Sequence, residues 1–385
     1  MVSLLLGIIY AAFISLGLPD ALLGAAWPVM VEDLSAPLSY AGVLSMIISF
    51  GTIVSSLLSD NITRRLGAGA VTAVSVALTA TALLGFSLSR NFIHLCLLAI
   101  PYGLGAGAVD AALNNYVALH YAGRHMNWLH AFWGVGATIG PYVMSWALGS
   151  RPGWRGGYGV IAVLQFALTA VLFCSLPLWK KRQTTHAEDA DYEAPIGLRE
   201  AVKIRGVKAI LAAFFGYCAL ETTAGLWAST YLVEHRGIQP QTAAAFASLF
   251  YIGITVGRFL SGCVSDRFGD KKMIRMGCGL MLSGLVMIAL PIPYLPLIGL
   301  VVMGFGCAPV YPAIIHSTPA HFGRENSHAI VGIQMASAYC GATFMPPVFG
   351  LIAQYIHVGL FPLFMAVFAA LLLGMTERVN RVCSH

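Results

Sequence analysis

The sequence predicts an all-α membrane protein with twelve transmembrane helices in two pseudo-symmetric six-helix bundles. Two observations predict this fold class. Apolar residues make up 58% of the 385-residue chain and charged residues only 10%, whereas soluble domains carry about 25% charged residues. The apolar residues also fall into repeated stretches of about 20, the length at which a helix crosses a bilayer. A lipid bilayer is therefore the expected surrounding of most of the chain.

Twelve apolar segments of near-spanning length follow one another along the chain. The longest polar stretch separates the sixth segment from the seventh. We therefore predict an N-terminal bundle over 1–179, a cytoplasmic linker over 180–206 and a C-terminal bundle over 207–385. The predicted segments are 3–31, 40–58, 67–88, 91–119, 127–149, 156–178, 207–233, 241–262, 273–291, 295–315, 327–355 and 358–375.

The basic residues predict the orientation in the membrane. With the N-terminus placed inside, 17 of the 22 Lys and Arg residues lie on the cytoplasmic side, four lie outside and Arg258 lies within a segment. Basic loops stay in the cytoplasm, so both termini are expected there, in the plasma (inner) membrane. The net charge of +6 is spread over short loops, and no nucleic-acid partner is expected.

The two halves of the sequence resemble each other. The first segment contains Asp20-Ala-Leu-Leu-Gly24 followed by Trp27, and the seventh contains Glu221-Thr-Thr-Ala-Gly225 followed by Trp227. Two related halves are typical of transporters that bind their substrate near the bilayer midplane. A receptor or scaffold that shares the fold without transporting anything is the alternative.

One loop resembles the signature of the major facilitator superfamily. Residues 262–272 contain a Gly, an Asp-Arg pair, a second Gly and a basic cluster, and a degraded copy follows the second segment. The resemblance implies the major facilitator fold. It also implies a conformational latch, in which the acid accepts hydrogen bonds from a helix N-terminus and from Arg. The latch candidates are Asp60, Arg64, Arg65, Asp266 and Arg267.

A narrower resemblance is to the fucose:proton symporter branch of that family. The fourth segment has a Gly-rich run ending in Asp110 and Asn114, the fifth contains Asn127, His130 and Trp133, and the first contains Asp20. The resemblance implies proton-coupled sugar symport. The branch has Glu where this chain has Asp110, and Gln and Asn in place of His130 and Trp133. Fucose itself is therefore not the expected substrate.

Three acids lie in the middle of apolar segments. A charged side chain at the bilayer centre costs about 2.5–3.5 kcal/mol, so it requires a reason. We predict that Asp20, Asp110 and Glu221 take part in proton coupling, with sodium as the second choice of ion; neutral, hydrogen-bonded structural acids are the alternative. Arg258 needs an anion, and we predict an ion pair with Glu221 at a similar depth. That pair could equally be structural.

Several aromatic and polar side chains are candidates for a sugar site. Sugars bind to apolar ring faces beside hydrogen-bonding groups. For the Trp residues of the first and seventh segments the alternative is anchoring at the membrane surface, and His130 could instead contact headgroups. The candidates are Trp27, Asn114, Asn127, His130, Trp133, Trp227 and Gln334.

The expected function is secondary active transport of a small polar solute, a sugar by preference, by a monomer that uses proton-coupled alternating access. The run Gly134-x-Gly136-x-x-x-Gly140-Pro141 resembles the antiporter signature of drug exporters. A proton-coupled exporter of amphipathic drugs or lipids is therefore the alternative. No nucleophile with a base and no metal-ligand spacing is present, so neither an enzyme nor a cofactor is expected. Pro312 and the pair Pro346-Pro347 predict breaks in the tenth and eleventh helices.

Overall fold

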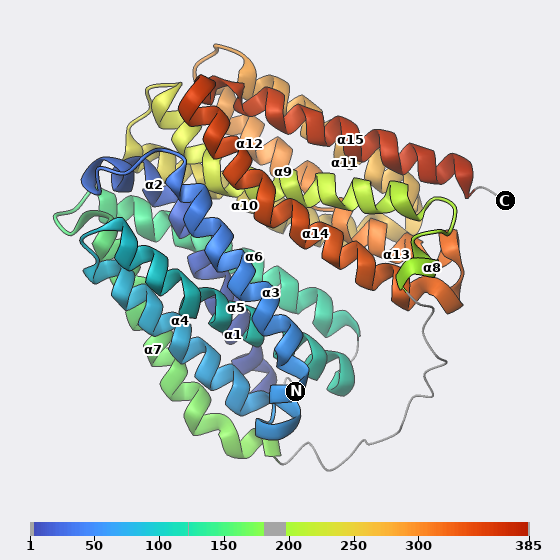
Figure 1. The fold of residues 1–385 in the computed structure, drawn as a ribbon, viewed down its shortest axis with the longest axis horizontal. Coiled ribbons are helices and arrows are strands. Elements are labelled where there is room, and N and C mark those ends of the chain that lie inside the picture. The colour runs from blue at the N-terminus through green and yellow to red at the C-terminus, as the bar shows by residue number, and fades with distance from the viewer. Residues whose placement is uncertain (1–3, 122, 181–197, 384–385) are drawn as a thin grey trace. The chain divides into compact units, whose positions relative to one another are not determined.

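The computed structural model describes residues 4–121, 123–180 and 198–383, and every regular element within these ranges is a helix (Figure 1). In the N-terminal half the helices are α1 Leu4–Asp20, α2 Leu22–Asp33, α3 Tyr40–Leu66, α4 Ala68–Leu88, α5 Phe92–His120, α6 Gly123–Leu148 and α7 Gly153–Lys180. In the C-terminal half they are α8 Leu198–Ala201, α9 Val207–Glu234, α10 Pro240–Phe268, α11 Asp270–Ala289, α12 Leu295–Cys307, α13 Val310–Phe322, α14 Arg324–Ile352, a π-helical turn Ala353–His357, a 3-10 turn Val358–Leu360 and α15 Phe361–Val382.

Each predicted apolar segment corresponds to one of these helices or to a pair of them. By length and hydropathy, 10 helical stretches within the described residues could cross a membrane. The last of them, Ile330–Val382, has 53 residues and covers both α14 and α15. The helix α6 is not among the 10 because Gly, Trp, Tyr and Pro reduce its mean hydropathy.

The chain divides into two compact units. The first unit is Met1–Glu188 with Leu232–Ser248, and the second is Asp189–Tyr231 with Leu249–His385. The boundary between the two units, at residues 188 and 189, lies in the predicted linker over 180–206. The units differ from the predicted bundles in one respect, because Leu232–Ser248, the end of α9, the turn and the start of α10, groups with the first unit.

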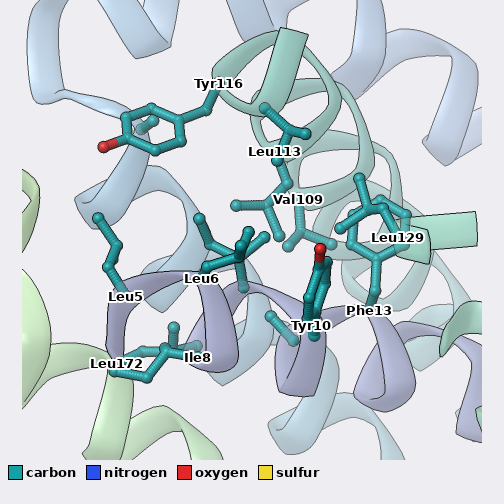
Figure 2. Packing of buried hydrophobic residues seen from close by; sticks show 14 of the residues in the cluster. Leu5, Leu6, Ile8, Tyr10, Phe13, Val109, Leu113, Tyr116, Leu129 and Leu172 are labelled. Atoms are coloured by element: carbon teal, nitrogen blue, oxygen red, sulfur yellow. The ribbon is translucent and has the colours of Figure 1, made fainter. Parts of the chain in front are cut away.

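Apolar side chains fill the interior of the first unit. Leu6, Phe13, Val109, Leu113 and Leu129 are buried in one cluster (Figure 2). These residues come from α1, α5 and α6, so the cluster joins the three helices that carry Asp20, Asp110 and Trp133.

The backbones of α1 and α6 touch through glycines. A Cβ atom at Gly17 would overlap the carbonyl oxygen of Trp133, and one at Gly136 or Gly140 would overlap the carbonyl oxygen of Ile14 or Leu18. Only glycine allows two helix backbones to approach this closely. Two glycines of the run that resembled an exporter signature, Gly136 and Gly140, therefore allow α6 to pack closely against α1.

Two of the membrane-length stretches are interrupted near their middle. The first breaks between α1 and α2 at Ala21, directly after Asp20. The ninth, Leu295–Phe322, breaks at Ala308 and Pro309 between α12 and α13, just before the break predicted at Pro312 in the tenth apolar segment. The break predicted at Pro346-Pro347 is wrong, since α14 continues through both residues to Ile352.

Candidate functional site

The polar centre of the first unit begins with Asp20, the last residue of α1. Its side chain is exposed at the break before α2. The indole Nε1 of Trp133 on α6 donates a hydrogen bond of 2.7 Å to the Asp20 Oδ2. A hydrogen bond to an ionised oxygen is shorter and stronger than a neutral one. The contact between α1 and α6 thus places a donor directly on the first predicted acid.

Asp110 on α5 is the second acid of this centre. Its Oδ1 accepts a hydrogen bond of 2.9 Å from the Nδ2 of Asn114, one helical turn further along. Asp110 also lies close enough to Asp20 for the two carboxyl groups to interact electrostatically. The structure therefore brings together four of the residues that the sequence singled out, on three different helices.

Neutral donors, and not cations, support the two acids. Among the side chains that the structure describes, no Lys, Arg or His forms an ion pair with Asp20 or Asp110. The Oδ1 of Asn114 is buried and accepts no hydrogen bond from another described group. Within the described part of the chain, the two acids therefore have no cation paired with them, and Asn114 keeps an unused acceptor.

The other predicted binding residues of the first unit lie in different surroundings. His130 is exposed on α6, and its ring packs edge-on against Phe13 at 5.9 Å. Trp27 is fully buried and donates its indole N–H to the Leu38 carbonyl oxygen at 2.9 Å. Asn127 belongs to α6, but its side chain is outside the part that the structure describes.

A different polar centre lies in the second unit. The Arg258 Nη2 on α10 is 3.5 Å from the Glu221 Oε1 on α9, and both side chains are mostly buried, at 21% and 17% exposed. Tyr217 lies against both groups, and Tyr311 on α13 is close to Arg258. The acid of this unit thus has a cation and a tyrosine beside it, and a second tyrosine lies near the cation.

The remaining predicted binding residues of the second unit are fully buried. Trp227 donates its indole N–H to the Pro346 carbonyl oxygen at 2.9 Å. Gln334 accepts a hydrogen bond of 3.2 Å from Thr318, while its Nε2 donates to no other described group. Trp227 therefore links α9 to α14, and, like Trp27, it donates its indole N–H to a backbone carbonyl oxygen.

The latch residues are only partly described. Arg65 and Arg267 are exposed near the ends of α3 and α10. The side chains of Asp60, Arg64 and Asp266 lie outside the described part of the chain. The latch therefore stays a prediction.

Sequence reasoning overlooked the tyrosines around Arg258. Tyr217 precedes Glu221 by four residues on α9, a spacing that puts both on one helix face. That spacing could have revealed Tyr217. Tyr311 comes from a helix distant in the sequence, and no local pattern indicates its approach.

Comparison with known proteins identifies the family of the chain. The model of the Major Facilitator Superfamily matches residues 9–246 and 209–380. The glucose/mannose transporter GlcP of Bacillus subtilis (strain 168) is 21% identical over 97% of this chain and 94% of its own length.

Solved structures share the fold. A crystal structure of the nucleoside transporter NupG superimposes with a TM-score of 0.75, at 14% identity, over 100% of both chains. A crystal structure of the transporter FucP in the outward conformation gives 0.64 at 15% identity, over 97% of this chain and 98% of FucP. The two family matches together cover nearly the whole chain, in a fold whose members are transporters and not enzymes. The chain is therefore a multi-pass membrane transporter of the Major Facilitator Superfamily.

Proposed function

We propose that this transporter is a proton-coupled symporter of a neutral sugar. The observation that carries the proposal is the pair of acids in the first unit, Asp20 and Asp110, which have neutral hydrogen-bond donors and interact with each other. A charged carboxylate inside a membrane is costly. A proton neutralises the carboxylate, so the transporter can close the centre off from water on one side and open it to the other at a lower cost in free energy. The proton then travels with the solute.

The groups around these acids favour a sugar. Trp133 offers a ring face, Asn114 has a free buried acceptor, and the Asp20 carboxylate is exposed to accept hydroxyl groups. Rings and hydrogen-bonding groups side by side are what a sugar requires. GlcP, described as a glucose/mannose transporter, is consistent with this substrate class, and NupG, a nucleoside transporter, carries a solute that contains a sugar.

The charges favour a neutral solute. Arg258 is the cation of the second centre, and Glu221 already lies beside it. An anionic solute would have to displace Glu221 and leave a carboxylate unpaired, which is strongly unfavourable. The export of an amphipathic drug would require a mainly apolar site, whereas Asp20 here interacts with an indole N–H and with a second carboxyl group.

The test uses proteoliposomes with a panel of labelled neutral sugars and a proton gradient. Asp20→Asn and Asp110→Asn should each abolish proton-driven accumulation, by about a hundredfold or more, and should retain exchange of sugar between the two sides. Exchange needs no net proton movement, so it separates coupling from folding.

Glu32→Gln is the matched control, because it removes an exposed carboxylate near the end of the same first span and should transport like the wild type. Accumulation at the wild-type level in both aspartate variants would contradict proton carriage by these acids. A wild type that accumulates no neutral sugar would contradict the substrate class.

A further inference from the structure

We propose that Gln165 on α7 positions Asp20 by supplying to α1 the hydrogen bond that Pro19 cannot make. Gln165 acts through the backbone of α1, so it is a positioning residue and not a binding residue. The inference rests on the proposed function for the task of Asp20, but the hydrogen bond itself concerns the protein alone.

A proline removes one backbone donor from α1. Pro19 lies inside this helix, directly before Asp20. In a regular helix the carbonyl oxygen of Ser15 would accept a hydrogen bond from the N–H of the residue four positions later. Proline has no N–H, and its ring presses against that carbonyl group. Ser15 lies near the middle of the membrane-length stretch Leu4–Asp33, where no bulk water can take the place of the missing donor.

Gln165 supplies the missing donor from the neighbouring helix. Its Nε2 donates a hydrogen bond of 2.8 Å to the Ser15 carbonyl oxygen. The Gln165 side chain is 2% exposed and lies near the middle of its own membrane-length stretch, Gly153–Trp179. A buried amide is costly unless it has a partner, and membrane helices tolerate proline where a neighbouring helix satisfies the freed backbone group. Pro19 and Gln165 therefore form one structural feature.

The packing between α1 and α7 is loose beside this hydrogen bond. A cavity of about 220 Å³ lies between the two helices, and Ser15, Leu18, Leu164 and Gln165 belong to its lining. The Ser15 side chain is 5% exposed, and its hydroxyl has no hydrogen-bond partner among the described groups. Few atoms of α7 therefore press on this turn of α1, and the hydrogen bond from Gln165 fixes where the turn lies relative to α7.

The turn that receives this hydrogen bond carries the first acid of the polar centre. Asp20 follows Pro19 directly and is the last residue of α1, before the break at Ala21. Trp133 on α6 donates to its carboxylate. The direction of the last turn of α1 decides whether the carboxylate reaches that donor. Without the donor from α7, the turn would rearrange towards the cavity to satisfy its free carbonyl group, and Asp20 would move with it.

The first measurement needs no solute. Gln165→Leu removes the amide donor, and Pro19→Ala restores a backbone N–H that can donate to the Ser15 carbonyl oxygen. In the full chain in detergent, Gln165→Leu should lower the melting temperature by about 3–8 °C, the effect of one unsatisfied buried group. In a Pro19→Ala background the same substitution should lower it by about 2 °C or less, because the backbone then supplies the donor.

Thr169→Val is the matched control. Thr169 lies one turn after Gln165 on the same helix, is 8% exposed, and donates its hydroxyl to the carbonyl oxygen of Gln165 within α7. This variant should give the same melting difference in both backgrounds. Equal losses for Gln165→Leu in the two backgrounds, or no loss in either, would overturn the inference. If Gln165→Leu alone gives no folded protein, a double variant with Pro19→Ala that folds supports the inference, and one that also fails to fold overturns it.

The second measurement separates positioning from stability. In proteoliposomes, Gln165→Leu should retain sugar exchange within about threefold and lose about tenfold in proton-driven accumulation, because Asp20 is displaced. Pro19→Ala/Gln165→Leu should recover most of this loss, and Thr169→Val should transport like the wild type. Accumulation and exchange that fall in parallel in Gln165→Leu would show a structural role alone and contradict the inference. If the wild type accumulates no sugar, the proposed function fails, and the melting comparison still decides whether Gln165 replaces the donor that Pro19 lacks.

Discussion

The polar centres of the two units both hold acids within membrane-length helices, but different kinds of group interact with those acids. In the first unit, Asp20 and Asp110 receive hydrogen bonds from an indole and an amide. In the second, Glu221 lies 3.5 Å from a guanidinium group. Neutral donors leave the charge of an acid free to change, while a permanent cation fixes it. The two units therefore hold their buried acids in different electrostatic surroundings.

The largest effect should come from breaking the pair in the second unit. Arg258→Met leaves Glu221 buried without its cation and should lower the free energy of unfolding by about 3–5 kcal/mol. Titration with a denaturing detergent measures this. The double variant Glu221→Gln/Arg258→Met removes both charges and should regain most of the loss.

A matched control lies in the first unit. Arg155 pairs with Asp33 at 2.6 Å, and these side chains are 33% and 42% exposed. Arg155→Met should cost about 1 kcal/mol or less, because water screens an exposed pair. Equal losses at Arg155 and Arg258 would contradict the view that burial makes the second pair costly to break. If the double variant folds but transports nothing, the pair has a role beyond structure.

A smaller effect is expected at the two buried indoles. Trp27→Phe and Trp227→Phe each remove the donor to a backbone carbonyl oxygen, the partly buried one of Leu38 and the buried one of Pro346. Each should cost about 1–2 kcal/mol of stability, seen as a lower melting temperature in detergent. Sugar exchange by the folded protein should change little. A loss of exchange without a loss of stability would instead support the sequence-based prediction that these residues bind the solute.

The smallest effect should come from the support of Asp110. Asn114→Ala removes the amide donor at 2.9 Å and should reduce proton-driven accumulation roughly fivefold, about 1 kcal/mol. Asn114→Asp offers a comparison, because it replaces the donor with a third carboxyl group beside Asp110 and should reduce accumulation further. Full activity in both variants would show that Asp110 works without its neighbour.

Much of the fold could be predicted because the bilayer imposes a length on each helix. The predicted segments match the helices closely, as at 67–88 against Ala68–Leu88. Larger differences occur where a helix continues into polar residues, as α3 does to Leu66. Hydropathy marks the part of a helix in lipid and gives no information about how far the helix extends beyond it.

The site could be predicted less completely. The similar depth of Arg258 and Glu221 in the membrane was enough to predict an ion pair between them, because an isolated charge at that depth is so costly. The bond between Trp133 and Asp20 joins residues 113 apart in the sequence and depends on how α6 is aligned with α1. Three glycines set that alignment, and their spacing alone does not reveal which helix they face.

The interrupted spans have a consequence for how the duplicated halves have diverged. The first unit is broken in its first span, at Ala21, and the second in its fourth, at Ala308 and Pro309, while the equivalent spans α9 and α5 are continuous. A discontinuity frees backbone groups and provides a point of flexure. The two halves are therefore interrupted at non-equivalent spans. Each half bends at its own position, so the internal movements of the halves do not follow the symmetry of the sequence repeat.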